Sequence, residues 1–176
     1  MRQEAGFSML EVLVALVIGM IGVLGMAGIQ ILAINDTERA RYQSIAALTA
    51  SSMVAEMQAN SAFWGATTVP ATVTASGSAV TVNGVLTAGG NCNGVVCTAS
   101  QMAYFDLQNW GRALAGALPS GNGTIACALT TSVVCTVKIN WTENNVALNN
   151  PTGAETGIFA SGTVGARSYQ TMVNIQ

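Results

Sequence analysis

The chain has 176 residues, enough for one compact domain and short for two. Charged residues make up only 8% of it, against about 25% in typical soluble domains, and hydrophobic residues make up 51%. A net charge of −2 provides no basic surface for nucleic acid, and the sequence contains no histidine, the commonest general base. Neither a phosphate-binding loop nor a dinucleotide-binding fingerprint occurs in it. The composition therefore predicts no nucleic-acid partner, no cofactor and no enzymatic activity.

The N-terminal part of the chain contains a long apolar segment. A polar leader, residues 1–6, precedes a run from Phe7 to Asn35 in which Glu11 is the only charged residue. As a helix, residues 12–35 would be roughly 36 Å long, more than the hydrocarbon core of a bilayer, which is about 30 Å thick. A carboxylate within such a segment costs about 2.5–3.5 kcal/mol on insertion scales, so Glu11 is a candidate functional residue.

A cleaved secretory signal peptide is the alternative interpretation of this segment. The leader carries Glu4 as well as Arg2, so it lacks a clearly positive n-region. The apolar run also exceeds an h-region of about 7–15 residues, and no convincing small-residue cleavage site follows it. These features favour a retained transmembrane helix. Its orientation stays open, because arginines flank the segment on both sides.

Residues 6–16, Gly-Phe-Ser-Met-Leu-Glu-Val-Leu-Val-Ala-Leu, resemble the N-terminus of type IV pilins and pseudopilins. The resemblance implies that a prepilin peptidase cuts between Gly6 and Phe7 and methylates Phe7. It also implies that Glu11 pairs with the N-terminal amine of a neighbouring subunit. A buried charge is costly unless it is paired, so this acid would favour assembly and fix axial register. A carboxylate favoured by the helix macrodipole, by about 0.3–1 kcal/mol, is the simpler interpretation, and both can hold.

Glycines recur every three residues within the apolar segment. Each costs about 1 kcal/mol of helix propensity relative to alanine. They would permit close approach of neighbouring helices or local unwinding, although glycine is also simply common in membrane helices. The four positions are Gly19, Gly22, Gly25 and Gly28.

The helix is expected to continue through residues 36–60, which contain neither glycine nor proline. The charged residues at 36–41 predict a solvated surface just outside the bilayer. Residues 61–91 predict a loop region with some strand, including a weak hairpin around Asn83-Gly84, a dipeptide suited to tight turns. The apolar residues that recur with helical spacing in the continuation, and are expected to pack on a sheet, are Ala46, Ala50, Met53 and Met57.

The rest of the chain predicts one more helix and at least three strands. A capping box at residues 98–101 begins the helix, and Pro119 ends it. Alternating residues over 135–142 predict a half-buried strand, whose hairpin partner contains residues 125–129, and residues 167–175 predict a last strand. The residues expected on buried faces are Ala103, Leu107, Trp110, Leu114 and Ala117 in the helix, Cys135, Val137, Ile139 and Trp141 in the first strand, Ile125, Cys127 and Leu129 in its partner, and Tyr169, Thr171, Val173 and Ile175 in the last.

These elements predict an α+β fold of the type IV pilin class, in which a long N-terminal helix packs on an antiparallel sheet and its first half spans the membrane. The expected organisation is a leader at residues 1–6, a hydrophobic assembly helix at 7–35, its amphipathic continuation at 36–60, and an extracytoplasmic head at 61–176.

The chain has four cysteines, all in the region expected outside the cytoplasm, which favours disulfides. Three connectivities are possible. Local pairs are favoured, because Cys92 and Cys97 flank a short loop, and Cys127 and Cys135 would face each other if a hairpin turned at Thr131. Metal binding is the rival interpretation, but these spacings suit zinc poorly and no histidine is present.

A second resemblance lies in the head. Residues 106–110, Asp-Leu-Gln-Asn-Trp, and 118–123, Leu-Pro-Ser-Gly-Asn-Gly, resemble the D-L-x-x-W…L-P-x-G-x-G region of the PilV class of minor pilins, the type IV pilus modification proteins. This resemblance implies a minor pilin that takes part in the initiation of pilus assembly and in the tip complex. The main alternative is a minor pseudopilin of a type II secretion system. A third is a membrane-anchored periplasmic binding or enzyme domain with a coincidental leader.

The resemblance also implies partners and a location. The partners would be the prepilin peptidase, other minor and major pilins, the inner-membrane assembly machinery and, before assembly, membrane lipid. The protein would lie in the bacterial inner membrane with its head in the periplasm, and then in the pilus, at or near the tip.

Overall fold

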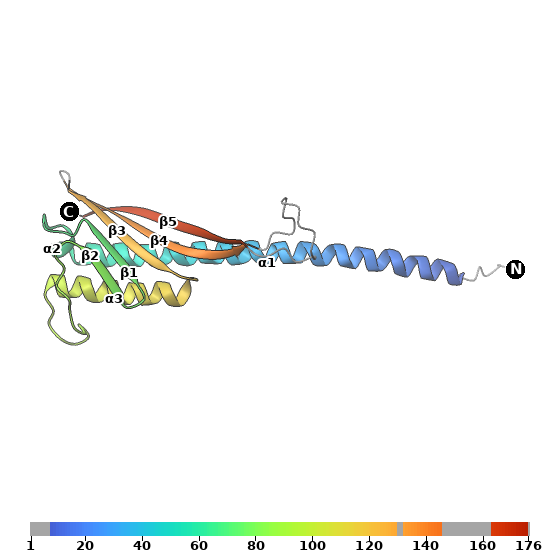
Figure 1. Ribbon diagram of the computed structural model, residues 1–176, viewed down its shortest axis with the longest axis horizontal. Coiled ribbons are helices and arrows are strands. Elements are labelled where there is room, and N and C mark those ends of the chain that lie inside the picture. The colour runs from blue at the N-terminus through green and yellow to red at the C-terminus, as the bar shows by residue number, and fades with distance from the viewer. Residues whose placement is uncertain (1–7, 130–131, 146–162, 176) are drawn as a thin grey trace. The chain divides into compact units, whose positions relative to one another are not determined.

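A computed structural model describes residues 8–129, 132–145 and 163–175, without the side chains of residues 27, 28, 31, 32, 144, 145, 163 and 164. The chain divides into two compact units, residues 1–38 and 39–176. Helix α1, Met9–Ala59, begins in the first unit and ends in the second (Figure 1). The boundary between the units therefore falls inside one helix, and the last part of α1 belongs to the head.

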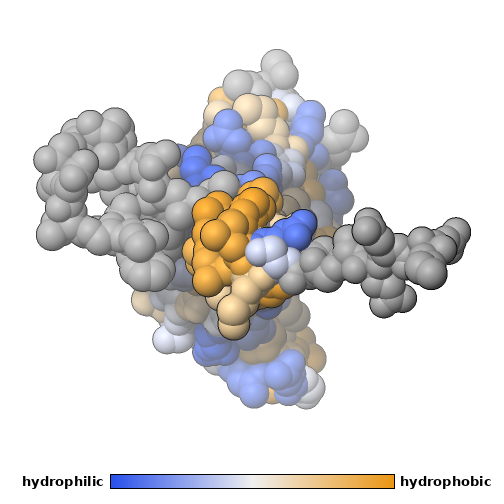
Figure 2. Space-filling model, turned by 90° about the vertical axis from the view of Figure 1, so that its right-hand side faces the viewer, coloured by the Kyte–Doolittle hydropathy of each residue, from blue (hydrophilic) through white to orange (hydrophobic). Residues whose placement is uncertain are grey.

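The first unit consists of the apolar part of α1. Its residues Met9–Met26 are apolar and long enough to cross a membrane, and none of this stretch is buried within the protein. Apolar side chains of this kind appear in orange in Figure 2. A helix that exposes large apolar residues all round needs lipid or other helices around it, because water solvates such a surface poorly.

The second unit is a two-layer structure, with helices on one face of a sheet. The sheet is antiparallel with strand order β2-β1-β3-β4-β5, and the strands are β1 Thr72–Ser76, β2 Ala79–Asn83, β3 Asn122–Leu129, β4 Val133–Asn145 and β5 Thr163–Ile175. The helices are the last part of α1, the short α2, Ser61–Trp64, and α3, Ala99–Ala117 (Figure 1). The fold is α+β, with an N-terminal apolar helix followed by an antiparallel sheet, as the sequence predicted.

The core lies between the helices and the inner face of the sheet. The four residues expected to form the buried face of α1, at positions 46, 50, 53 and 57, are all buried. On the sheet, the register aligns inward-facing residues of neighbouring strands, so that Val73, Ile125 and Val137 lie in one row. Because inner positions alternate with polar outer ones such as Lys138, the period of two identified this face correctly.

Helix α3 begins and ends where its capping signals predicted. The Thr98 side chain accepts a hydrogen bond from the Gln101 amide, and the Gln101 side chain accepts one from the Thr98 amide, which completes the capping box. The predicted face was wrong at its last position, because Ala117 is exposed and Leu118, one residue beyond the helix, fills that place in the core. Pro119 ends the helix, and the side chain of Leu118, just before it, turns into the core.

The first hairpin was placed wrongly. It joins β1 to β2 through Gly77-Ser78, whereas Asn83 is the last residue of β2 and Gly84 follows it. Gly77 has a φ of 56°. A positive φ at the first central residue alone is the pattern of type II′ turns, which favour glycine there. Gly77 therefore suits the turn that the structure forms.

The second hairpin has the predicted register, with Cys127 opposite Cys135. Leu129, expected on its buried face, is 54% exposed, although Val133 opposite it is buried. The pairing of β3 with β1 ends at Ala126, so β1 does not flank Leu129. In the last strand, Val173 and Ile175 are buried and Tyr169 packs against the core, as expected. That strand begins at Thr163, four residues before the predicted start.

Candidate assembly site and polar groups of the head

Glu11 lies in the first turn of α1 and is exposed. The Ser8 carbonyl accepts hydrogen bonds from the Glu11 and Val12 amides, at 3.0 and 3.3 Å, so the helix begins immediately after Ser8. A carboxylate at this point is favoured by the helix dipole. Among the residues that the structure describes, Glu11 has no ion-pair partner. Its position thus leaves the carboxylate accessible to a group on another molecule.

The expected cleavage site, Gly6 and Phe7, lies outside the described residues. The glycines at 19, 22 and 25 all lie within α1, and an added Cβ at any of them would meet nothing within 4 Å. Packing against the described residues therefore does not require these three glycines.

Trp110, the tryptophan of the D-L-x-x-W sequence, joins three elements of the head. Its indole Nε1 donates a hydrogen bond of 3.0 Å to the Thr49 carbonyl of α1. Its ring lies directly against Gly123 of β3, where any Cβ would overlap the ring carbons. Gly121 is likewise pressed against the Leu114 carbonyl. The L-P-x-G-x-G sequence therefore supplies one glycine that lets β3 pack closely on α3 and one that lets the chain turn tightly at the end of that helix.

Glu143 is the one charged side chain buried among the described residues, only 6% exposed. Trp141 Nε1 donates a hydrogen bond to its Oε1 at 2.9 Å. Arg167 Nε donates to its Oε2 at 3.2 Å, and Arg39 Nε lies 3.6 Å from the same oxygen. A buried carboxylate with this many donors is well compensated. Arg39, which was expected in a solvated surface, is exposed, and its ion pair also links α1 to the end of the sheet.

Glu56 of α1 and Asp106 of α3 form a second polar group that the sequence did not reveal. Burial, together with the charge of Asp106, raises the pKa of Glu56 to about 7. Burial also raises the pKa of Asp106. The Oε2 atom of Glu56 has no hydrogen-bond partner. The two carboxyls thus lie close enough to repel each other when both are ionised.

The cysteines form the two local disulfides, Cys92–Cys97 and Cys127–Cys135, which was the favoured pairing. The first closes a loop before α3, and the second joins β3 to β4. Among the described residues, no group of three or more metal-binding side chains comes together. Glu11 belongs to the first unit, and the four cysteines belong to the second.

Comparison with known proteins identifies one feature. Residues 1–27 match the model of the prokaryotic N-terminal methylation motif. No curated protein and no solved structure matches the chain. The motif marks the leader of pilins and pseudopilins, which implies processing by a prepilin peptidase and assembly with other pilins. Together with the apolar helix and the α+β head, the motif supports a type IV pilin-like protein that is anchored in the inner membrane.

Proposed function

We propose that the protein is a minor pilin of a type IV pilus, which takes part in the initiation of pilus assembly and in the tip complex. The observation that carries the proposal is the methylation motif at residues 1–27, followed by an apolar helix whose residues 9–26 are not buried by any other described part of the chain. Such a helix is stable in lipid before assembly and in a bundle of similar helices afterwards.

In this proposal, prepilin peptidase cuts between Gly6 and Phe7 and methylates the amine of Phe7. The amine of one subunit then pairs with the exposed Glu11 of its neighbour. An unpaired carboxylate at membrane depth is costly, so pairing favours a subunit that is docked in one axial register over a free one.

The head supports the minor-pilin assignment through the sequence at Asp106–Trp110 and Leu118–Gly123, which resembles the PilV class. In this chain these residues hold α3 against α1 and β3, through Trp110 and Gly123. Their role is thus to shape the head that contacts other minor pilins. The leader alone is compatible with a minor pseudopilin of a type II secretion system as well.

The test uses Glu11→Ala and wild type, each co-expressed with prepilin peptidase in a piliated host. We expect both proteins to lose residues 1–6, and only the wild type to appear in sheared pili, as measured by mass spectrometry of the pilus fraction. Glu38→Gln, an exposed acid on the same helix, is the control and should enter pili normally.

Three outcomes would contradict the proposal in different ways. An N-terminus that still begins at Met1 would remove the pilin assignment. Normal incorporation of Glu11→Ala would remove the role given to that acid. Wild-type protein that is processed but found only with a secretion pseudopilus would replace the pilus with the secretion system.

A further inference from the structure

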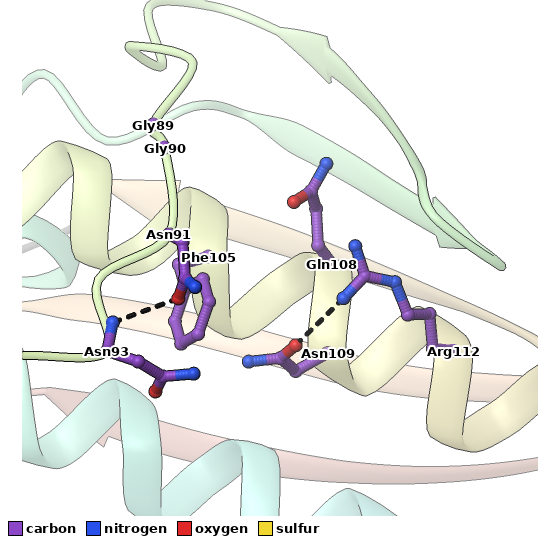
Figure 3. A pocket seen from close by; sticks show the side chains of 8 residues that line it. All are labelled: Gly89, Gly90, Asn91, Asn93, Phe105, Gln108, Asn109 and Arg112. Carbon is purple, nitrogen blue, oxygen red and sulfur yellow. Dashed lines mark hydrogen bonds between the residues drawn. The ribbon is translucent and has the colours of Figure 1, made fainter.

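A polar hollow lies in the head, between α3 and the loop that precedes it. Its volume is about 450 Å³, within the range of about 300–1,000 Å³ that is usual for small-molecule sites. Figure 3 shows the loop on one side and the side chains of α3 on the other. The residues that line it are Gly89, Gly90, Asn91 and Asn93 of the loop, and Phe105, Gln108, Asn109 and Arg112 of α3.

The lining combines carboxamides with one guanidinium and one aromatic ring, and it includes no carboxylate. A carboxamide both donates and accepts hydrogen bonds, as a sugar hydroxyl does, so the two kinds of group complement each other. The Phe105 ring also lines the hollow, where it offers an apolar surface to the C–H groups of a sugar ring. Arg112 gives the hollow a positive charge that favours an anionic ligand.

Several polar groups of the hollow keep bonding capacity after their contacts within the chain. Asn91 Oδ1 accepts from the Asn93 amide at 3.0 Å, which leaves the Asn91 NH₂ as a donor. Asn109 Oδ1 accepts from Arg112 Nη1 at 3.2 Å, which leaves the Asn109 NH₂ and the other guanidinium N–H groups. Gln108 Nε2 donates to the Ser78 carbonyl at 3.3 Å, which leaves its carbonyl oxygen as an acceptor.

The loop wall is held in place before any ligand binds. The Cys92–Cys97 disulfide closes the loop. The Thr87 amide donates a hydrogen bond of 2.8 Å to the Ser100 hydroxyl at the start of α3. Gly89 packs so closely on the Gln101 backbone that a Cβ would overlap it. A site held in this way loses little conformational entropy when it binds a ligand.

We propose that this hollow binds a saccharide that carries a carboxylate, such as a uronic or nonulosonic acid. The Arg112 guanidinium pairs with the carboxylate, the carboxamides pair with ring hydroxyls, and Phe105 packs on the ring. Hydroxyls orient the sugar and the carboxylate sets the preference for acidic over neutral saccharides. The proposal does not depend on the pilus, because all the lining residues belong to the head unit.

The test uses the full-length protein in lipid nanodiscs, which avoids detergents with sugar headgroups. Binding of a panel of uronic and nonulosonic acid saccharides is measured by calorimetry, beside the methyl ester of each saccharide. The ester keeps the hydroxyls and removes the charge. We expect at least one acid to bind with saturation, and about tenfold more tightly than its ester, which is the usual scale of a charge-assisted pair.

Substitutions in the lining test whether the saccharide binds in this hollow. Arg112→Gln is expected to abolish the difference between acid and ester, and Asn109→Ala to weaken both. Lys138→Gln removes an exposed positive charge from β4, away from the hollow, and should bind as wild type does. Circular dichroism checks that each variant is folded, and Arg112 and Asn109 are exposed positions that the core does not need.

Three results would overturn the proposal. One is that no saccharide of the panel binds with saturation. Another is that Arg112→Gln and Lys138→Gln lower the affinity equally, which would indicate a general effect of charge. The last is that acetate competes as well as the acidic saccharides do, which would indicate a simple anion site.

Discussion

At the residue scale, the glycines of the head differ in what their missing side chains permit. At Gly123 a Cβ would overlap the Trp110 ring, whereas at Gly116 of α3 it would meet nothing within 4 Å. Since Trp110 also donates to the Thr49 carbonyl, a shift of its ring would disturb α1 as well as β3. Gly123 is therefore required by packing, and Gly116 is not.

We expect Gly123→Ala to lower the free energy of unfolding by about 1–3 kcal/mol, because an overpacked core must shift. The matched control, Gly116→Ala, should raise it by about 0.5–1 kcal/mol, because alanine is the better helix former. Urea unfolding of the full-length protein in nanodiscs, followed by tryptophan fluorescence, measures both. Equal effects of the two variants would contradict the role assigned to Gly123.

Glu143 shows, at the same scale, how hydrogen bonds and nearby positive charges compensate the burial of a carboxylate. Its carboxylate accepts hydrogen bonds from the indole of Trp141 and the guanidinium of Arg167, and Arg39 lies near the same oxygen as Arg167. The period of two placed Trp141 on the inner face, and two more residues along the strand reach Glu143. The alternation along the strand is therefore consistent with a buried Glu143. It does not indicate that Arg39, more than a hundred positions away, lies beside the carboxylate.

At the element scale, the contact of α1 with α3 contains the two carboxyls of Glu56 and Asp106. The pKa of Glu56 is raised to about 7 from 4.5, chiefly by burial and also by the charge of Asp106. For an acid whose pKa is raised on folding, the stabilising contribution is full below the unfolded value and is lost as the pH rises through the folded value. The contact is accordingly weaker at pH 8 than at pH 4.5.

We expect Glu56→Gln to stabilise the protein at pH 8 by about 1–2 kcal/mol, a figure reduced for the partial exposure of the side chain. The difference from wild type should shrink at pH 4.5, because both side chains are then neutral in the folded state. Thermal unfolding at the two pH values measures it. Glu38→Gln serves as the control, and a Glu56→Gln difference that is independent of pH would rule out this account.

The helices and the second hairpin were predictable because their signals are local. The capping box of α3 lies within four residues, and the spacing of Ala46 and Met57 repeats along one helix. The first hairpin was not predicted correctly, because Asn83-Gly84 and Gly77-Ser78 are both plausible turns. Pairing of β1 with β3 selects between them, and that pairing joins segments about fifty residues apart.

At the scale of the whole molecule, the exposed apolar residues of α1 fit an anchor in the membrane. Leu16, in the first unit, is 58% exposed, and Leu48, in the head, is 69% exposed. Their exposure within the chain is similar, but only Leu16 lies in the stretch long enough to span a membrane. Their environments should therefore differ in the cell.

We expect Leu16→Arg to reduce the fraction of protein that resists carbonate extraction from membranes, because a central charge costs about 2.5–3.5 kcal/mol on insertion. Leu48→Arg, the same change at an exposed leucine of the same helix, should leave that fraction unchanged. Immunoblots of the membrane and soluble fractions measure both. Equal extraction of the two variants would show that residues 9–26 do not anchor the protein.

The sequence by itself determined the features that depend on neighbouring residues. These are the leader and its acid at Glu11, the membrane-length helix, the buried face of its continuation, and a hairpin with Cys127 opposite Cys135. Only the tertiary structure decided which distant groups lie together: Arg39 beside Glu143, Glu56 near Asp106, and a loop across a hollow from Arg112 of α3. The reason is physical. Periodicity and capping depend on residues that are close together in the sequence. The partner of a polar side chain depends instead on how helices and strands pack in space, and no local sequence pattern gives that arrangement.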